Sequence, residues 1–131
     1  MSTVTKQFQR LQVDELAGRD GDDLLLPLPT TEMTVSGTFT PRKGFEVLEL
    51  NHASTPVAVT VAAPVKGSYL VITDTSASGT AAHSVTLTAG DYDGAGGNAA
   101  TFNAPEETLV LYGVSATRYV IVANIGSVAI A

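Results

Sequence analysis

The stretch from Asp91 to Asn98 (DYDGAGGN) combines carboxylates and glycines, the residue types of a calcium loop or a nucleotide loop. As an EF-hand loop it supplies oxygens at the first and third positions, but Ala95 occupies the fifth and Phe102 the twelfth, where a glutamate is needed. A dinucleotide loop must lead into a helix, and no helical pattern follows. We therefore interpret the stretch as a glycine-rich turn with positive φ angles, and a weak surface calcium site near Asp91 stays open.

The residue types of a serine hydrolase, His83, Asp74 and either Ser76 or Ser84, occur close together in the sequence. A catalytic triad is defined by its arrangement in space, and only residue types support one here. His83 and His52 both lie at the edges of turns, where local hydrogen bonding is their common role. Two histidines without a close third ligand do not predict a zinc site. We expect no catalytic residues, no metal site, no cofactor and no enzymatic activity.

Three further charged residues are interpreted as parts of turns. Glu106 and Glu107 follow Pro105 and are adjacent, so in a strand they point to opposite faces and cannot form a glycosidase pair. We interpret them as solvated turn charges. Arg118, next to Tyr119, has the chemistry to clamp a carboxylate of a partner, although an arginine at a strand edge is the commoner case.

Composition favours binding or structure over chemistry. The chain has 131 residues, no cysteine and no tryptophan, which excludes disulfides, thiolate sites and tryptophan stacking platforms. Its net charge of -6 has the wrong sign for nucleic acid or an anionic membrane, so we expect neither partner. No apolar run reaches the roughly 18 residues of a membrane span. The first eleven residues mix polar and apolar types, so we expect no export signal and synthesis in a cytoplasm.

From Thr34 onward, apolar and β-branched residues alternate with threonine and serine at period two, which is typical of strands with one buried face. Turn clusters recur every 8 to 12 residues or so. The pattern predicts an all-β fold, a sandwich or a barrel/prism, of about nine short strands. The expected strands are 35–40, 45–50, 57–63, 69–75, 83–89, 99–102, 108–112, 117–123 and 125–130.

Three of these strands contain nearly continuous apolar runs, at residues 69–72, 109–112 and 119–123. Such runs are typical of strands that are buried on both faces. A second subunit would cover the extra surface, and we expect a homotrimer in which these strands line a shared core. A central strand flanked on both sides within one chain is the alternative. The body residues expected at the interface are Tyr119, Ile121, Ile125, Val128 and Ile130.

The chain is expected to divide into an N-terminal arm, residues 1–34, and a β-body for oligomerisation, residues 35–131. Val4, Phe8 and Leu11 have the spacing of a short helix. Two prolines then give an extended or polyproline geometry to an apolar segment. Its residues, expected at an interface, are Leu24, Leu25, Leu26, Pro27, Leu28 and Pro29. This segment either folds back over its own body or lies on a neighbouring subunit.

Three blocks of the sequence resemble small β-rich virion proteins of tailed bacteriophages. They are residues 68–90, with an apolar strand ending in Asp74 and then a Thr/Val strand; residues 98–111, with an Asn-Ala-Pro turn; and residues 117–128, with an aromatic residue before Val-Ile. The likeness covers about residues 56–131 and is to capsid decoration (cement) proteins and to fibre modules.

The resemblance implies a trimeric protein on the outside of the phage head, made in the host bacterial cytoplasm. There it would bind the major capsid protein, bridge capsomers and stabilise the capsid lattice, with a terminal arm between subunits. The alternative is a tail fibre or baseplate module whose loops 76–82 and 91–98 bind a host-surface glycan. The chain has no coiled-coil or collagen-like stalk, unlike the fibre version.

Overall fold

The structure is a computed structural model that describes residues 28–77, 81–94 and 96–131, and these residues form eleven strands in two sheets. The strands of sheet A, in spatial order, are β1 (Thr30–Met33), β3 (Phe45–Leu50), β5 (Tyr69–Asp74), β9 (Thr108–Ser115), β10 (Arg118–Ile125) and β7 (Asp91–Tyr92). The strands of sheet B are β11 (Ala129–Ile130), β8 (Ala99–Phe102), β6 (His83–Leu87), β4 (Ala58–Val61) and β2 (Gly37–Phe39). The all-β class is therefore confirmed.

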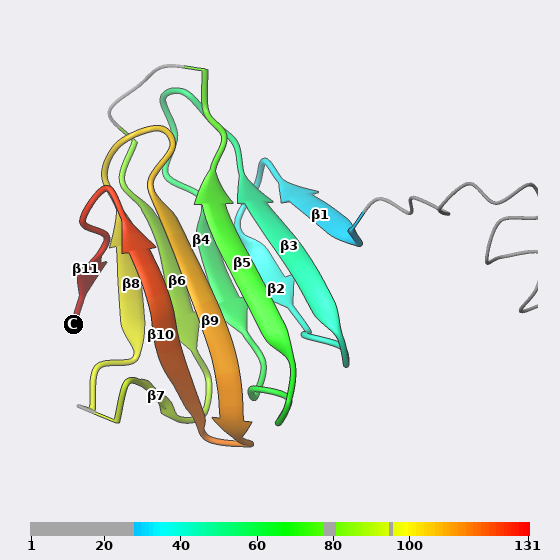
Figure 1. The fold of residues 1–131 in the computed structure, drawn as a ribbon. Coiled ribbons are helices and arrows are strands. Elements are labelled where there is room, and N and C mark those ends of the chain that lie inside the picture. The colour runs from blue at the N-terminus through cyan, green and yellow to red at the C-terminus, as the bar shows by residue number, and fades with distance from the viewer. Residues whose placement is uncertain (1–27, 78–80, 95) are drawn as a thin grey trace, which may run out of the picture.

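The first six strands wind like a solenoid. Successive strands alternate between the two sheets, so β1, β3 and β5 are parallel neighbours in sheet A while β2, β4 and β6 are parallel neighbours in sheet B. Parallel strands need a crossover connection, and here the intervening strand of the other sheet provides it. Each pair of strands, β1–β2, β3–β4 and β5–β6, forms one rung (Figure 1).

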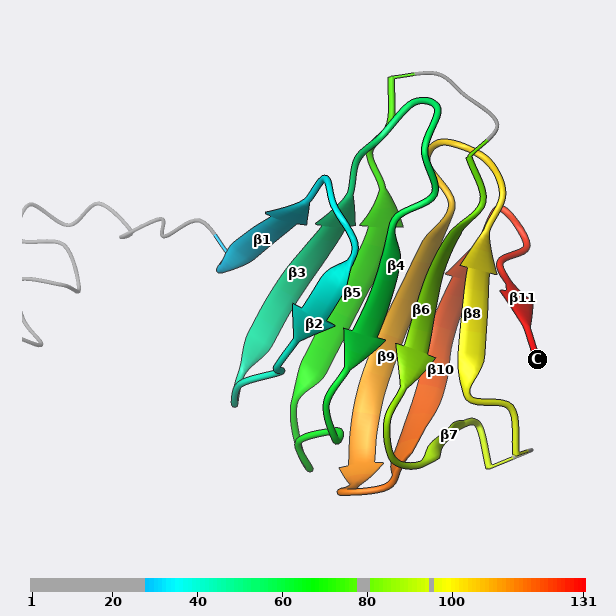
Figure 2. The same cartoon turned by 180° about the vertical axis from the view of Figure 1, so that it is seen from behind.

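The last five strands close one side of this winding. Strand β9 pairs antiparallel with β5, and β8 pairs antiparallel with β6. Strands β10 and β11 then extend the two sheets, and β7 lies parallel to β10 at the edge. Figure 2 shows sheet B with β2 and β11 at its two borders. Strands β1 and β2 lie at the opposite borders of the two sheets, where the winding begins.

This winding is not the sandwich or barrel expected from the sequence. The short turn-rich segments lead the chain from each of the first five strands into the opposite sheet. Eight strands were located within a few residues, whereas β1 and the two-residue β7 were not predicted. The expected strand 125–130 is divided between the end of β10 and β11.

Part of the expected arm belongs to sheet A. Residues 30–33 form β1, which pairs with β3 in the register Thr30 opposite Val47. The helical spacing expected at Val4, Phe8 and Leu11, and the leucines up to Pro27, lie outside the described residues.

The core lies between the two sheets and follows from the period-two alternation. Most inward positions of sheet A are leucine or isoleucine, and most of those of sheet B are valine, leucine or phenylalanine. The main members are Leu48, Leu50, Leu70, Ile72, Leu109 and Leu111 from sheet A, and Val59, Val61, Val85, Leu87, Ala100 and Phe102 from sheet B, all at most 2% exposed. Burying such side chains stabilises the fold by about 1.5–3 kcal/mol each.

Gly113 in β9 is required by a close backbone approach. A Cβ atom at this position would lie 2.3 Å from the carbonyl oxygen of Val65, in the loop before β5. The backbones are held there by two hydrogen bonds, from Gly113 N to Ser68 O and from Gly67 N to Gly113 O. A side chain would push this loop off sheet A.

We therefore expect Gly113→Ala to lower the free energy of unfolding by about 1–3 kcal/mol, the usual range for overpacking, in urea denaturation. Gly37→Ala is the matched control, because its Cβ would meet only the flexible end of Met33, at 3.2 Å. Equal stability of the two variants would contradict the close approach.

Candidate interaction surface

The outer face of sheet A carries an apolar surface across its four central strands. Most outward positions of these strands are aromatic or β-branched, although the other side of the sheet already covers the core. We call this surface the apolar face; it consists of Phe45, Val47, Tyr69, Val71, Val110, Tyr112, Val120 and Val122. Four of them are more than a third exposed: Phe45 and Tyr69 at 39%, Val120 at 37% and Val122 at 56%. Contiguous exposed apolar surface of this kind marks an interaction site.

The strand register arranges the apolar face in two rows. In the aromatic row, Phe45 lies opposite Tyr69, Tyr69 opposite Tyr112, and Tyr112 opposite Val120. In the valine row, Val47, Val71 and Val110 are successive partners, and Val122 lies at an irregularity of β10. Such a bulge re-aims a side chain, and Val122 is the most exposed member of the face.

The rings of the aromatic row pack against each other. The Phe45 and Tyr69 ring centroids are 5.5 Å apart with planes 22° from parallel, and those of Tyr69 and Tyr112 are 4.9 Å apart. A ring that stacks on its neighbour uses its face for that contact. The aromatic row therefore forms one continuous apolar ridge, in which the rings do not present separate flat surfaces.

The ends of the apolar face differ in charge. All four lysine and arginine residues of the described chain are exposed and lie at the end of sheet A where β3, β5 and β10 begin. They are Arg42, Lys43, Lys66 and Arg118. Beyond the valine row, the outward positions of β1 and β3 are the acidic Glu32 and Glu49, which lie opposite each other. The aromatic row thus has a basic border, and the valine row has an acidic one.

The sequence-predicted body residues lie mainly inside the chain. Tyr119 and Val128 are buried in its own core, and Ile121 and Ile130 pack against that core. Ile125 is 57% exposed. Their contact with another subunit stays a prediction. The predicted apolar runs do contain residues of the apolar face, and these alternate along each strand with residues of the core. Phe45 was not singled out from the sequence.

The structure brings Asp74, Ser76 and His83 together, all buried. The Ser76 hydroxyl lies 3.0 Å from His83 Nε2, and the Asp74 carboxylate lies 3.8 Å from the same nitrogen. The other nitrogen, Nδ1, accepts the Val57 N–H, so the neutral ring carries its proton on Nε2 and donates it to Ser76. In a serine hydrolase the two ring nitrogens face the serine and the carboxylate separately.

The cluster instead joins the segment that follows β3, the segment that follows β5 and the start of β6. Ser76 Oγ also accepts the N–H of His52 and donates to the His52 carbonyl, while Asp74 Oδ1 accepts the Ser76 N–H. Ser84, the other serine considered for a triad, points to the opposite side of β6. The geometry is that of a satisfied buried network, which fixes the loops at this end of the sheets.

The turn from Asp91 to Asn98 uses its carboxylates for its own backbone. Asp91 Oδ1 accepts the Gly94 N–H, and Asp93 Oδ1 accepts the Ile121 N–H. The expected positive φ angles are present, at Gly94, Gly96 and also Asp93. The described residues hold no group of three or more potential metal-ligating side chains, and the weak calcium site remains a prediction.

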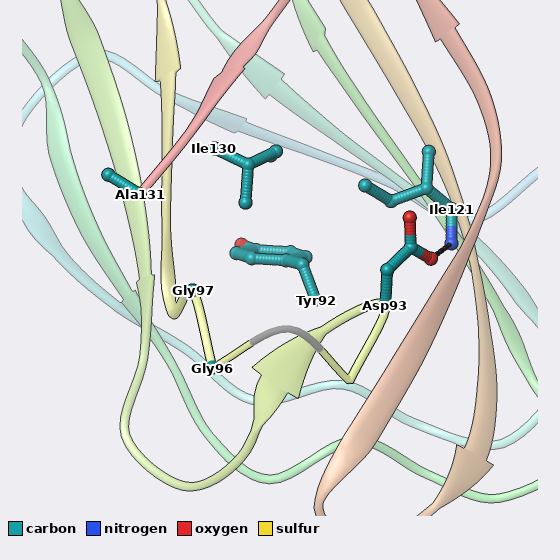
Figure 3. A pocket seen from close by; sticks show the side chains of 7 residues that line it. All are labelled: Tyr92, Asp93, Gly96, Gly97, Ile121, Ile130 and Ala131. Atoms are coloured by element: carbon teal, nitrogen blue, oxygen red, sulfur yellow. Dashed lines mark hydrogen bonds between the residues drawn. The ribbon is translucent and has the colours of Figure 1, made fainter.

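A hollow of about 450 Å³ lies between this turn, β10 and β11. Figure 3 shows the Tyr92 ring at its centre, with Ile130 on one side and the bond from Asp93 to Ile121 on the other. Gly96, Gly97 and Ala131 line the remaining wall. The lining is apolar or small, and its one carboxylate is already hydrogen-bonded.

Two buried carboxylates, Glu107 and Glu46, have structural partners within the chain. Glu107 is only 7% exposed and accepts the N–H groups of Asn103 and Ala104, which corrects its interpretation as a solvated charge. Glu46 points inward and pairs with the exposed Arg42, 3.4 Å away, and with its backbone N–H. Burying a carboxylate costs free energy unless it is paired and hydrogen-bonded, and these donors offset that cost.

Two buried tyrosines, Tyr92 of β7 and Tyr119 of β10, are neighbours on paired strands and stack. The rings of Tyr92 and Tyr119 are 6.4 Å apart, and the Tyr92 hydroxyl donates to the Val85 carbonyl. Burial raises the pKa of Tyr92, with a smaller effect of Tyr119. Burial, and then the nearby charge of Glu46, raise the pKa of Tyr119 to about 12. Within the described structure the Tyr119 hydroxyl has no hydrogen-bond partner.

Searches with this chain found no matching family model, curated protein or solved structure. None of the described residues belongs to a helix long and apolar enough to cross a membrane.

The Ser76 network predicts a specific stability loss. Ser76→Ala removes the acceptor for two donors, the buried His83 Nε2–H and the half-buried His52 N–H, so we expect the free energy of unfolding to fall by about 1–3 kcal/mol. Ser84→Ala, on the other side of β6, should change it by less than about 0.5 kcal/mol. Chemical denaturation measures both, and a Ser84→Ala loss as large as that of Ser76→Ala would contradict this network.

The Tyr119 phenol predicts a loss of stability in alkali. Between its unfolded pKa of 10.0 and its folded pKa of about 12, the unfolded chain gives up this proton while the folded chain keeps it. The free energy of unfolding therefore falls as the pH rises through this range.

We expect Tyr119→Phe to reduce this fall by roughly 2 kcal/mol at pH 12, and to change stability at pH 7 by less than about 1 kcal/mol, because its hydroxyl lacks a partner. Denaturation curves at pH 7, 10 and 12 make the comparison. An unchanged alkaline slope would show that Tyr119 does not carry this effect.

Proposed function

We propose that this chain is a non-enzymatic structural protein of a tailed-phage virion, which binds the outside of the head as a cement or decoration protein. The observation that carries the proposal is the apolar face, an exposed apolar surface over β3, β5, β9 and β10. Such a surface on a small acidic chain needs a protein partner. The resemblance of residues 56–131 to phage decoration proteins supplies the setting.

The proposed attachment is mechanical. A body whose strands pair in two sheets around one core presents its apolar face as a stiff surface, and the polar N-terminal segment that precedes β1 adds contacts along the major capsid protein. Trimerisation through apolar strands belongs to this proposal, with the valine row as the surface between subunits or against the capsid. Contacts of the order of 1,000 Å² would suffice for specific attachment.

The alternative, a tail-fibre or baseplate module that binds a glycan, is less well supported. Sugars are gripped by the exposed faces of aromatic rings, but the rings of Phe45 and Tyr69 stack on each other. In the loop 91–98 the one aromatic residue, Tyr92, is buried. Electron microscopy of virions labelled with an antibody to the chain would separate the two proposals by position, at the head or at the tail.

We expect charges in the valine row to prevent attachment. Val71→Lys combined with Val122→Lys should lower occupancy on expanded heads at least ten-fold in a cosedimentation assay, because desolvating a lysine opposes apolar contact. Both side chains point away from the core, so the body should fold normally.

The matched control is Thr60→Lys together with Ala58→Lys, on the outward side of β4 in sheet B. This pair has the same charge change on the opposite face. Wild-type occupancy of the valine-row variant, or an equal loss in the control, would overturn the proposed role of sheet A.

A further inference from the structure

The strands that carry the apolar face make a surface wide enough for a second sheet. Strands β3, β5, β9 and β10 are neighbours in sheet A, as Figure 1 shows. Strands lie about 4.8 Å apart and successive outward residues about 6.8 Å apart, so the two rows of the face and the outward row on each side span roughly 19 by 27 Å. Two such surfaces in contact cover roughly 1,000 Å², the area at which specific protein interfaces begin. The face can therefore hold a second copy of this chain.

The two rows of the apolar face differ in height. The aromatic row is a ridge of packed rings, whereas the valine row beside it carries only short β-branched side chains. Facing sheets pack closely when the side chains of one fill the spaces left by the other. A two-fold axis that runs across the strands, between the rows, would place the ridge of each copy over the valines of the other, with Tyr69 over Val71. An axis along the strands would set ridge against ridge.

Charge selects the same axis. Lys43 and Lys66 precede β3 and β5, and Arg118 begins β10, so these three exposed residues lie at one end of sheet A. At the other end, Glu49 projects from the outer side of β3, and the exposed Glu106 precedes β9. An axis across the strands would lay the basic end of each copy over the acidic end of the other. An axis along the strands would bring like charges together.

One acidic pair of the single chain is explained by this arrangement. Glu32 of β1 and Glu49 of β3 lie opposite each other on the outer side of sheet A. Like charges directly opposite on neighbouring strands destabilise a sheet. The lysine and arginine residues of the described chain all lie at the other end of the sheet. With the axis across the strands, Lys43 of the second copy comes near Glu49, because the two residues are equally far from Glu46 along the chain, at the axis.

We propose that two copies of this chain pair face to face through sheet A, with their strands antiparallel across the contact, so that the aromatic row of each copy covers the valine row of the other. The contact is isologous, so it closes as a dimer and leaves sheet B exposed. The pairing itself does not depend on the virion assignment. One consequence rests on the proposed function: the dimer covers the face assigned to the capsid, so it is the free form of the chain and must open before attachment.

Light scattering of the full-length protein tests the pairing in the absence of phage heads. We expect the mass to rise with concentration from that of one chain to that of two, since an interface of this area is at the lower end of the specific class. Tyr69→Lys puts a charge under the contact and should weaken dimerisation at least ten-fold. Thr86→Lys is the matched control, on the outward side of β6 in sheet B, and should leave dimerisation unchanged.

Three results of this experiment would overturn the proposal. They are a chain that stays monomeric at a concentration of about 1 mM, a mass of three chains, and an equal effect of the two lysine substitutions. Circular dichroism confirms that both variants are folded. A variant that still dimerises but no longer attaches to heads bears on the proposed function alone.

A charge exchange tests the direction of the strands across the contact. Lys43→Glu would face Glu49 of the second copy and should weaken dimerisation at least three-fold, whereas adding Glu49→Lys to the same chain should restore it. If the strands ran in the same direction, Lys43 would lie over the basic end and Lys43→Glu would strengthen the dimer. That result, or a double variant as weak as Lys43→Glu alone, would overturn the antiparallel arrangement.

Discussion

The fold depends on one constraint: each strand must bury alternate side chains in a single layer between two sheets. In the first six strands this is met by winding, so each rung adds one inward set to each sheet, such as Leu48 and Leu50 from β3 or Val59 and Val61 from β4. In-register parallel pairing keeps these sets aligned from rung to rung. The later antiparallel strands continue the same core without changing which side of each strand faces inward.

The ends of this core are closed by polar groups, and this explains residues that first suggest chemistry. Asp74, Ser76 and His83 satisfy one another where β5 and β6 meet, and Glu46 does the same with Arg42 at the other end. The aspartate, serine and histidine have the residue types of a catalytic triad, but in this fold they join loops. What remains for interaction is the outer surface of sheet A, where no such polar closure is made among the described residues.

The sequence predicted the strands well because period-two alternation is a local property. It could not predict the winding, since a short turn rich in glycine or proline fits a hairpin and a crossing between sheets equally well, and pairing of β3 with β5 is a contact between distant residues. The candidate surface was half predicted: apolar runs such as Tyr69–Ile72 revealed two apolar sides, but not which side faces outward. Tyr119 was therefore expected at an interface although it lies in the core.

The start of the coil has a consequence for solubility. Strands β1 and β2 leave the borders of both sheets without a further strand among the described residues, and such an unpaired edge is a template for pairing with another molecule. The borders are short, at four and three residues, Pro29 precedes β1 without an N–H to donate, and Glu32 projects from its centre. Pairing of two β1 edges would bring the Glu32 carboxylates of both molecules close together, so this border opposes association between copies of the chain.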